Sequence, residues 1–327
     1  MKTMKRILAF ALALATLFTL MVVPASAATY TVGSKSTQVK YIHFNLAFLG
    51  YDPGLATTKY TRQTAEAVLE FQEDHNLDPD SIAGPLTLGA LWNEVIRWQM
   101  MLTELGYYSG SLDGIAGSGC CTALKYFQRD YGLNPTGLLN ARTERTLWRA
   151  YLRMLEDSDN EIDRFKAEAI SEWTLPLKDS FAAVIDHRQF GTWRSGGRIH
   201  AGIDFVAPAG TPIYACQSGT VIWVNEFYQG TYEVVVQHDD ASIIRYGEVK
   251  SLVSVGDYVE QGDQIASIMR ASGGTEMLHL ECYYGTESSR ILSQTWNRSY
   301  SYVPAANYQR RADLLDPMFL MLCDVWD

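Results

Sequence analysis

The sequence has no Cys-x-x-Cys pair, although it contains five cysteines among its 327 residues. Cys120 and Cys121 are adjacent, and the other three are far apart. Structural zinc sites built from thiolates use closely spaced cysteine pairs, so this spacing argues against such a site. Cys216 and Cys282 fall in segments that we predict to be strands, where we expect them to be small buried side chains.

Basic residues are also scarce. The chain holds 27 Lys and Arg against 37 Asp and Glu, which gives a formal net charge of −10. Contacts to nucleic-acid phosphates need Lys and Arg, so an acidic chain is a poor nucleic-acid binder. We therefore predict no nucleic-acid partner.

Long apolar runs are confined to the N-terminus. The basic start Met1-Lys2-Thr3-Met4-Lys5-Arg6 is followed by an apolar run from Ile7 to Val23 and then by Ala25-Ser26-Ala27. This pattern is typical of a secretory signal peptide over residues 1–27, and the alternative is a retained membrane anchor. Cleavage after Ala27 removes three basic residues and takes the formal charge from −10 to −13.

No other segment of the sequence is long and apolar enough to span a membrane. We therefore predict a secreted, extracytoplasmic protein without a stable membrane span after signal cleavage. The sequence leaves the oligomeric state open.

Three short sequence motifs occur twice in the next part of the chain, with one fixed offset between the copies. Leu-Gly-Tyr, Phe-Gln and Leu-Trp stand at 49–51, 71–72 and 91–92, and again 56 residues later at 105–107, 127–128 and 147–148. A fixed period with apolar residues kept in place indicates duplicated structural units. Apolar residues at i, i+1 and i+4 within each unit predict short helices around one small core.

These repeated motifs resemble the peptidoglycan-binding helical module found beside many cell-wall enzymes. The resemblance extends to the loop Asp113-Gly114-Ile115-Ala116-Gly117 and the run Gly84-Pro85-Leu86-Thr87. The resemblance implies two small all-α three-helix modules, over residues 33–92 and 93–150, with peptidoglycan as their partner.

Each copy departs from the family pattern at one place. The first copy has no Asp-Gly loop between Tyr51 and Tyr60, and the second carries Cys120 and Cys121 where the family usually has Thr and a polar residue. Either change could have cost that copy its ligand, so one or both copies could instead be spacers.

The composition changes after the second copy. Acidic residues cluster between 151 and 175, where we predict a helical linker with a solvated face. β-branched residues then alternate or cluster at 219–224 and 233–238, with glycine turns between them. This pattern predicts an antiparallel β-rich domain over residues 176–327.

His200 and Asp204 are the first candidate metal ligands in this domain. Gly202, Ile203 and the apolar run to Pro208 favour a strand or tight loop over a helix at this point. Two histidines and one aspartate would leave one position of a tetrahedral zinc open.

The second histidine of that set is His279, in the stretch 277–283. This stretch has the period of a strand, which places Met277, His279 and Glu281 on one face. Distant histidines are also often unrelated, so the residue types alone leave the site open.

The motifs in this region resemble those of lysostaphin-type (LytM-like) peptidoglycan metalloendopeptidases. The first zinc motif matches 200–204 with 207–208 and 212–215, the closing motif matches 278–281, and 219–221 and 255–265 fall between them in family order. The resemblance implies a barrel-like, duplicated-hybrid-motif domain that binds Zn²⁺ through His200, Asp204 and His279. It also implies hydrolysis of peptide bonds in peptidoglycan stem peptides or cross-bridges.

Both helper histidines of that family are replaced in this chain, by Met277 and by Glu248. A thioether cannot donate a strong hydrogen bond, whereas a carboxylate can act as a general base. We therefore name Glu248 as the candidate catalytic base, with His187 as the alternative. Glu281 is the candidate partner for the second ring nitrogen of His279.

Two hypotheses follow from these replacements. The first is an exported, cell-wall-associated zinc metalloendopeptidase. The second is a catalytically degenerate zinc-binding member that acts as a peptidoglycan-binding or interaction protein.

Overall fold

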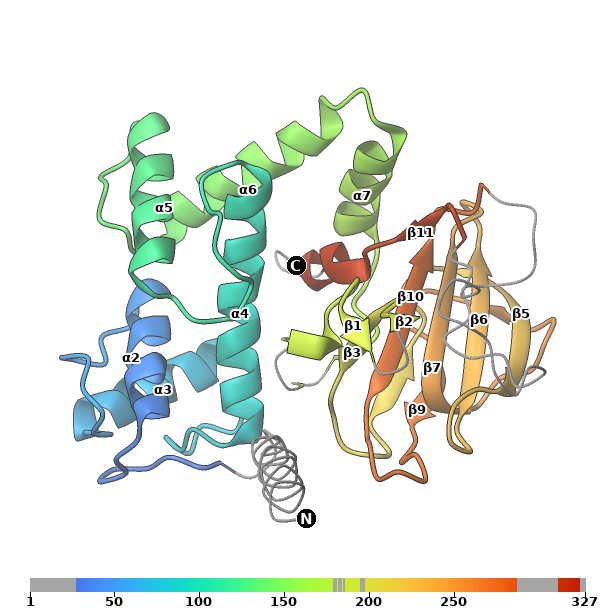
Figure 1. Ribbon diagram of the computed structural model, residues 1–327, viewed down its shortest axis with the longest axis horizontal. Coiled ribbons are helices and arrows are strands. Elements are labelled where there is room, and N and C mark those ends of the chain that lie inside the picture. Colours follow the sequence, from blue (N-terminus) through green and yellow to red (C-terminus); the bar gives the residue numbers. More distant parts are fainter. Residues whose placement is uncertain are drawn as a thin grey trace, which may run out of the picture.

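A computed structural model describes residues 28–178, 181, 184, 186–194, 198–286 and 311–323. The predicted signal peptide over residues 1–27 lies outside this part of the chain. Helices form the N-terminal part and an antiparallel sheet forms the C-terminal part, which confirms the predicted fold class (Figure 1). Among the described residues, no helix combines the length and the apolar character needed to cross a membrane.

Two successive three-helix units form the helical part, and they share one helix. The helices are α2 (Thr37–Phe48), α3 (Arg62–Asp74), α4 (Pro85–Glu104), α5 (Ser118–Asp130) and α6 (Ala141–Glu156). The first half of α4 closes the first repeat and its second half opens the second, because this helix continues through positions 92 and 93. Pro85 begins α4 directly after Gly84, and the side chain of Asn140 caps the first turn of α6.

The glutamine of the repeated Phe-Gln motif holds the loop before the next helix in both units. Its buried side chain donates to a side chain and a carbonyl of the loop before the next helix, and to a threonine in the first turn of that helix. The partners are Asp80, Ile82 and Thr87 for Gln72, and Thr136, Leu138 and Thr143 for Gln128, at 2.9–3.3 Å. The loop is therefore held by one amide group in each repeat.

The first copy holds its other loop without the Asp-Gly motif. In the second copy, Gln99 donates to Asp113 at 2.9 Å and accepts from the backbone N–H of Gly114 at 3.0 Å. The position 56 residues earlier is His43, whose Nδ1 accepts from the backbone N–H of Thr57 at 3.0 Å. A buried histidine thus replaces the glutamine, which accounts for a folded first copy that lacks the motif.

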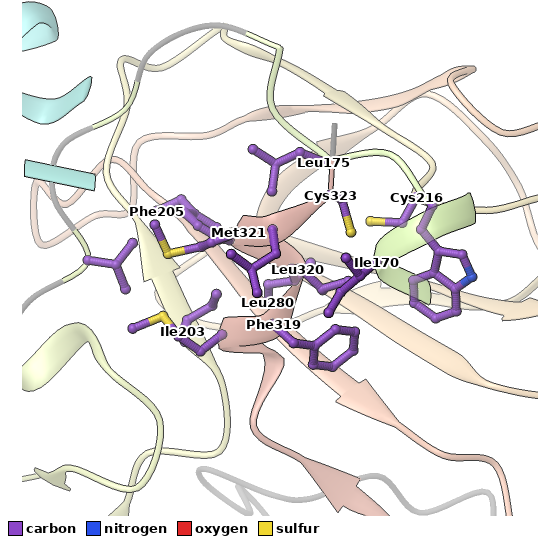
Figure 2. Packing of buried hydrophobic residues seen from close by; sticks show 14 of the residues in the cluster. Ile170, Leu175, Ile203, Phe205, Cys216, Leu280, Phe319, Leu320, Met321 and Cys323 are labelled. Atoms are coloured by element: carbon purple, nitrogen blue, oxygen red, sulfur yellow. The ribbon is translucent and has the colours of Figure 1, made fainter. Parts of the chain in front are cut away.

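Helix α7 (Glu161–Glu172) joins the helical part to the sheet by packing as well as by connection. Its buried face meets η3 (Pro317–Leu322), the last described turn of the chain. Figure 2 shows Ile170 of α7 beside Phe319 and Leu320 of η3, with Leu280 of β10 and Cys216 in the same cluster. Cys216 and Cys282 are buried, as predicted.

Within the described residues, nine strands form one antiparallel sheet. Its strands are β3 (Ile203–Phe205), β4 (Pro212–Tyr214), β5 (Gly219–Glu226), β6 (Tyr232–His238), β7 (Ile243–Ser251), β8 (Tyr258–Val259), β9 (Gln264–Ile268), β10 (Leu278–Tyr283) and β11 (Leu314–Leu315). The main order is β11-β10-β7-β6-β5-β8, while β3 pairs with β10, and β9 pairs with both β7 and β4. Strands β5 and β6 cover the two predicted strands at 219–224 and 233–238.

Two shorter elements precede this sheet. A short helix, η1 (Asp186–Arg188), is followed by β1 (Trp193–Arg194), which pairs with β2 (Arg198–Ile199). The chain then enters β3, so the segment from η1 to β2 leads directly to the first candidate metal ligand.

We expect Gln128→Leu to lower the free energy of unfolding by about 1–3 kcal/mol, because it leaves buried loop groups without their hydrogen-bond partner. Urea denaturation measures this change, and Gln38→Leu on the exposed face of α2 is the control. Equal stability of the two variants would contradict the role assigned to this glutamine.

Candidate metal centre

Strand register brings the candidate ligands together. Strand β3 runs antiparallel to β10, and Asp204 lies directly opposite His279. Directly opposed residues on neighbouring strands have Cβ atoms about 4.5–5.5 Å apart. His200 lies just before β3, and all three residues are at most 4 % exposed.

One atom from each of the three residues points to a common centre. His200 Nε2 lies 3.1 Å from Asp204 Oδ1 and 3.1 Å from His279 Nδ1, and the latter two atoms are 2.9 Å apart. Nitrogen and oxygen ligands at about 2.0–2.1 Å from a tetrahedral zinc would stand about 3.3 Å from each other. The observed triangle is therefore close to the size that zinc requires.

The outer nitrogens of both histidines have partners that fix the proton. His200 Nδ1 lies 2.9 Å from the backbone carbonyl oxygen of Gln189, which can only accept. His279 Nε2 lies 3.0 Å from a carboxylate oxygen of Glu281. In the neutral rings the inner nitrogens then carry the lone pairs, which is the form that binds a metal ion.

Charges around the triangle are balanced inside the protein. Burial alone would raise the pKa of Asp204, but the close contacts of its carboxylate with His200 and His279 hold that pKa well below its ordinary value. Burial opposes the charged form of His279, yet its hydrogen bonds to Asp204 and Glu281 raise the pKa of its ring to about 9. A proton would therefore compete with a metal ion for His279 Nδ1.

The outer nitrogen of His279 contacts a buried network of charged side chains. Arg245 of β7 lies directly opposite Glu281 of β10. Its guanidinium donates to both carboxylate oxygens of Glu281, at 3.0 and 3.2 Å. Its Nε lies 2.9 Å from a carboxylate oxygen of Glu233 on β6. Although burial would raise it, the pKa of Glu281 is lowered to about 2 by the charge of Arg245 and by His279. Glu281 thus remains ionised and holds the His279 ring.

A bulge in β7 positions Glu248. Two consecutive β6 residues face Gly247 and Val249, so Glu248 is the extra residue between them. Its backbone is left-handed, with φ of 63°, an unusual conformation for a side chain of this size. Gly247 lies directly opposite His279, so the bulge places Glu248 beside the ligand strand.

Glu248 is buried, and its charge interacts with those of His279 and Asp204. Burial is the main cause that raises the pKa of this carboxylate to about 7. The hydroxyl of Thr275 donates to one carboxylate oxygen at 3.4 Å. A carboxylate with this pKa exchanges protons readily near neutral pH.

The remaining sequence candidates, Met277 and His187, lie outside this group. Met277 is half-buried and comes directly before β10, and His187 is exposed on η1. Neither of them belongs to the group of side chains that could hold a metal ion.

The motifs did not predict Arg194 or Arg245. Arg194, in β1, forms an ion pair with the second carboxylate oxygen of Asp204. Strand pairing decides which charge meets which carboxylate, and the motifs carry no information about it. The one available signal was Arg245 within the apolar run Ile243-Ile244-Arg245-Tyr246, because a charge in a buried strand needs an opposite charge.

The residues present fit a zinc ion by three criteria. The donor set is two imidazole nitrogens and one carboxylate oxygen, the spacing of the three atoms suits a tetrahedral ion, and both histidines have partners on their outer nitrogens. Three protein ligands would leave a fourth position for water or substrate.

Comparisons with known protein families match both parts of the chain. Residues 198–291 match a family model described as Peptidase family M23. Residues 35–91 and 93–147 each match a model described as Putative peptidoglycan binding domain.

Individual relatives cover the chain to different extents. "Uncharacterized lipoprotein YgeR" of Escherichia coli (strain K12) is 33% identical over 202 residues, which cover 56% of this chain and 80% of that protein. "Spore cortex-lytic enzyme" of Bacillus subtilis (strain 168) is 40% identical over 97 residues, or 28% of this chain and 32% of the relative. A zinc-containing peptidase from Vibrio cholerae, solved as a crystal structure, is 27% identical with a TM-score of 0.30, covering 34% of this chain and 36% of that chain.

We expect the chain to bind about one zinc ion per molecule, and His279→Ala to lose it, since one of only three protein ligands is removed. Elemental analysis of purified protein gives the zinc content, and His187→Ala, an exposed histidine of the same domain, is the matched control. Equal zinc in wild type and His279→Ala would rule out the ligand assignment.

Proposed function

Because the chain belongs to peptidase family M23, we propose that it is an exported, cell-wall-associated zinc metalloendopeptidase that hydrolyses peptide bonds in peptidoglycan stem peptides or cross-bridges. The observation that carries this proposal is the buried triangle of His200 Nε2, Asp204 Oδ1 and His279 Nδ1. The name of the Bacillus subtilis relative, a spore cortex-lytic enzyme, and the two matches to a peptidoglycan-binding model support the same substrate class. That relative is covered over only about a third of its length, so the whole activity is part of the proposal.

A zinc ion bound at this centre would polarise a peptide carbonyl and lower the pKa of a bound water. The protein's own part is to hold the three ligand atoms and to handle protons. Glu281 keeps the His279 ring oriented, and Arg245 keeps Glu281 ionised. Burial of the ligands excludes bulk water from their inner side, which strengthens electrostatic interactions there.

Glu248 is the group that moves a proton in this proposal. With a pKa of about 7, its carboxylate can accept a proton from the attacking water near neutral pH. The protonated carboxyl can then give that proton to the leaving amine of the cleaved peptide bond. The bulge at Glu248 is consistent with this role, because left-handed backbone at a non-glycine residue is often found at functional sites.

One observation favours the second candidate function, a zinc-binding member without catalysis. The position where related peptidases carry a helper histidine is Met277, whose thioether cannot donate a strong hydrogen bond to developing charge. Removal of one such donor typically costs a factor of about 10²–10³ in rate. The presence of the three candidate zinc ligands does not distinguish an enzyme from a binding protein, because a structural zinc needs the same ligands.

We propose that the second repeat supplies wall binding. It has a hollow of about 460 Å³, and its lining includes Ser118, Thr122 and the rings of Tyr107, Tyr108 and Tyr126. Aromatic rings beside hydroxyl groups suit an amphipathic saccharide or peptide, because the rings provide apolar area and the hydroxyls provide hydrogen bonds.

The first repeat differs at the corresponding positions. Fifty-six residues earlier, Tyr126 corresponds to Glu70 and Thr122 to Glu66. Carboxylates in place of the hydroxyl and the aromatic ring make this face a poorer match to the same ligand.

We expect Glu248→Gln to reduce peptide release from purified cell walls by a factor of about 10²–10⁴ while leaving bound zinc unchanged, because the amide cannot take up a proton. Met277→His should raise the rate, since it adds a hydrogen-bond donor. Free amines released from the wall are measured, with a chelator-treated sample as the blank.

Two outcomes would change the proposal. If Glu248→Gln cleaves as well as wild type, the base is another group, and His187 is the next to test. If wild type releases nothing above the chelator blank while Met277→His combined with Glu248→His does, the natural protein is a zinc-bearing binding protein.

We expect Tyr126→Ala to weaken binding to purified, insoluble peptidoglycan about tenfold, which corresponds to roughly 1.4 kcal/mol of lost contact. Glu70→Ala, at the matching position of the first repeat, should leave binding unchanged. Co-sedimentation over a range of wall concentrations measures both. The opposite pattern would assign wall binding to the first repeat.

A further inference from the structure

The carbonyl that orients His200 belongs to a segment held by the helical repeats. Gln189 lies between η1 and β1, and its backbone oxygen is 2.9 Å from His200 Nδ1. The same oxygen accepts from the hydroxyl of Thr192 at 2.7 Å. The position of this carbonyl therefore decides both the tautomer and the direction of the His200 ring.

The side chain of Gln189 crosses to the second repeat. Its amide nitrogen donates to the backbone carbonyl of Leu112 at 2.8 Å and to that of Val184 at 3.3 Å. Leu112 is 77 residues away in sequence and directly precedes the Asp-Gly loop of the repeat. One residue thus contacts the wall-binding repeat with its side chain and the candidate zinc ligand with its backbone.

The loop after Leu112 is rigidly held. Gln99 of α4 donates to Asp113 and to the carbonyl of Ile115, at 2.9 and 3.2 Å. Asn45 of α2 donates to the carbonyl of Gly114 at 2.8 Å, and its side-chain oxygen accepts from the backbone of Ala116 at 2.9 Å. Both repeats therefore fix the loop that Gln189 contacts.

A second contact fixes the start of the same segment. The buried amide of Asn93, in α4, donates to the carbonyl of Phe181 and accepts from the backbone N–H of Val184, both at 3.2 Å. The ring of Phe181 packs edge-on against Phe205, the residue after Asp204, with ring centroids 4.7 Å apart. The approach to the metal centre is thus attached to the helical part at two points.

We propose that Gln189 is a positioning residue for His200, and that the second peptidoglycan-binding repeat, through Leu112, is a structural part of the metal centre. The helical part then does more than tether the catalytic domain to the wall. This inference rests on the proposed function only in taking His200, Asp204 and His279 as a zinc site.

The test compares the full mature chain with its Gln189→Met variant, which keeps the length of the side chain but removes both donated hydrogen bonds. Zinc affinity is measured by competition with a colorimetric chelator, and the visible absorption spectrum of the Co²⁺-loaded protein reports ligand geometry. We expect zinc affinity to fall by a factor of about 10–100, the usual effect of losing a partner that orients a ligand. The Co²⁺ spectrum should change as well.

A matched control separates positioning from general stability. Gln261 also donates its amide to a distant backbone carbonyl, that of Glu172 at 2.6 Å, but it has no contact with the ligands. Gln261→Met should leave zinc affinity and the Co²⁺ spectrum unchanged. Thr192→Val, which is isosteric, removes a donor to the Gln189 carbonyl and should weaken zinc binding in the same direction, even if Gln189→Met does not fold.

The proposal is overturned if Gln189→Met and Thr192→Val bind zinc as tightly as wild type, with the same Co²⁺ spectrum. It is also overturned if Gln261→Met weakens zinc binding as much as Gln189→Met does. A wild-type chain that binds zinc, loses affinity on Gln189→Met and yet cleaves no wall peptide supports the role of Gln189. That result would remove only the proposed peptidase activity.

Discussion

The antiparallel pairing of Asp204 with His279 is the contact on which the candidate metal centre depends. It joins two motifs that are 75 residues apart and fixes two of the three ligand atoms across neighbouring strands. A one-residue slip of β3 against β10 would turn Asp204 to the other face of the sheet, because successive side chains alternate. The apolar neighbours on both sides, Ile203 and Phe205, are fully buried and oppose such a slip.

Several ionised groups lie in the interior around this pair, and each has a partner. Asp204 is paired with the two histidines and with Arg194, while Glu281 is paired with His279 and Arg245. A buried charge without a partner would cost several kcal/mol, so these pairings are conditions for the fold as well as for the site. Glu248 differs, because no ion pair is formed by its carboxylate among the described contacts and its pKa is raised to about 7. This difference in environment separates Glu248, the proposed proton carrier, from the groups that hold the candidate ligands.

The candidate metal centre also connects to the helical part of the molecule. His200 is oriented by Gln189, Gln189 contacts the second repeat, and that repeat is tied to the first by Asn45. Helix α7 and η3 add an apolar contact between the helical part and the sheet (Figure 2). The second repeat and the sheet domain share one continuous core, whereas the first repeat has a core of its own and is joined to the second by contacts such as that of Asn45.

The sequence by itself determined the class of each part and indicated three candidate ligand positions. A fixed offset of 56 residues revealed the two helical units, and alternating residues revealed strands such as β5 and β6, because repeats and periods are local properties of the chain. Only the tertiary structure decided which groups surround the ligands. Strand register placed Arg245 against Glu281, a bulge placed Glu248 beside β10, and interdomain packing placed Gln189 between Leu112 and His200. Such contacts join residues that are distant in sequence, and their geometry depends on the packing of the whole molecule, which no local pattern specifies.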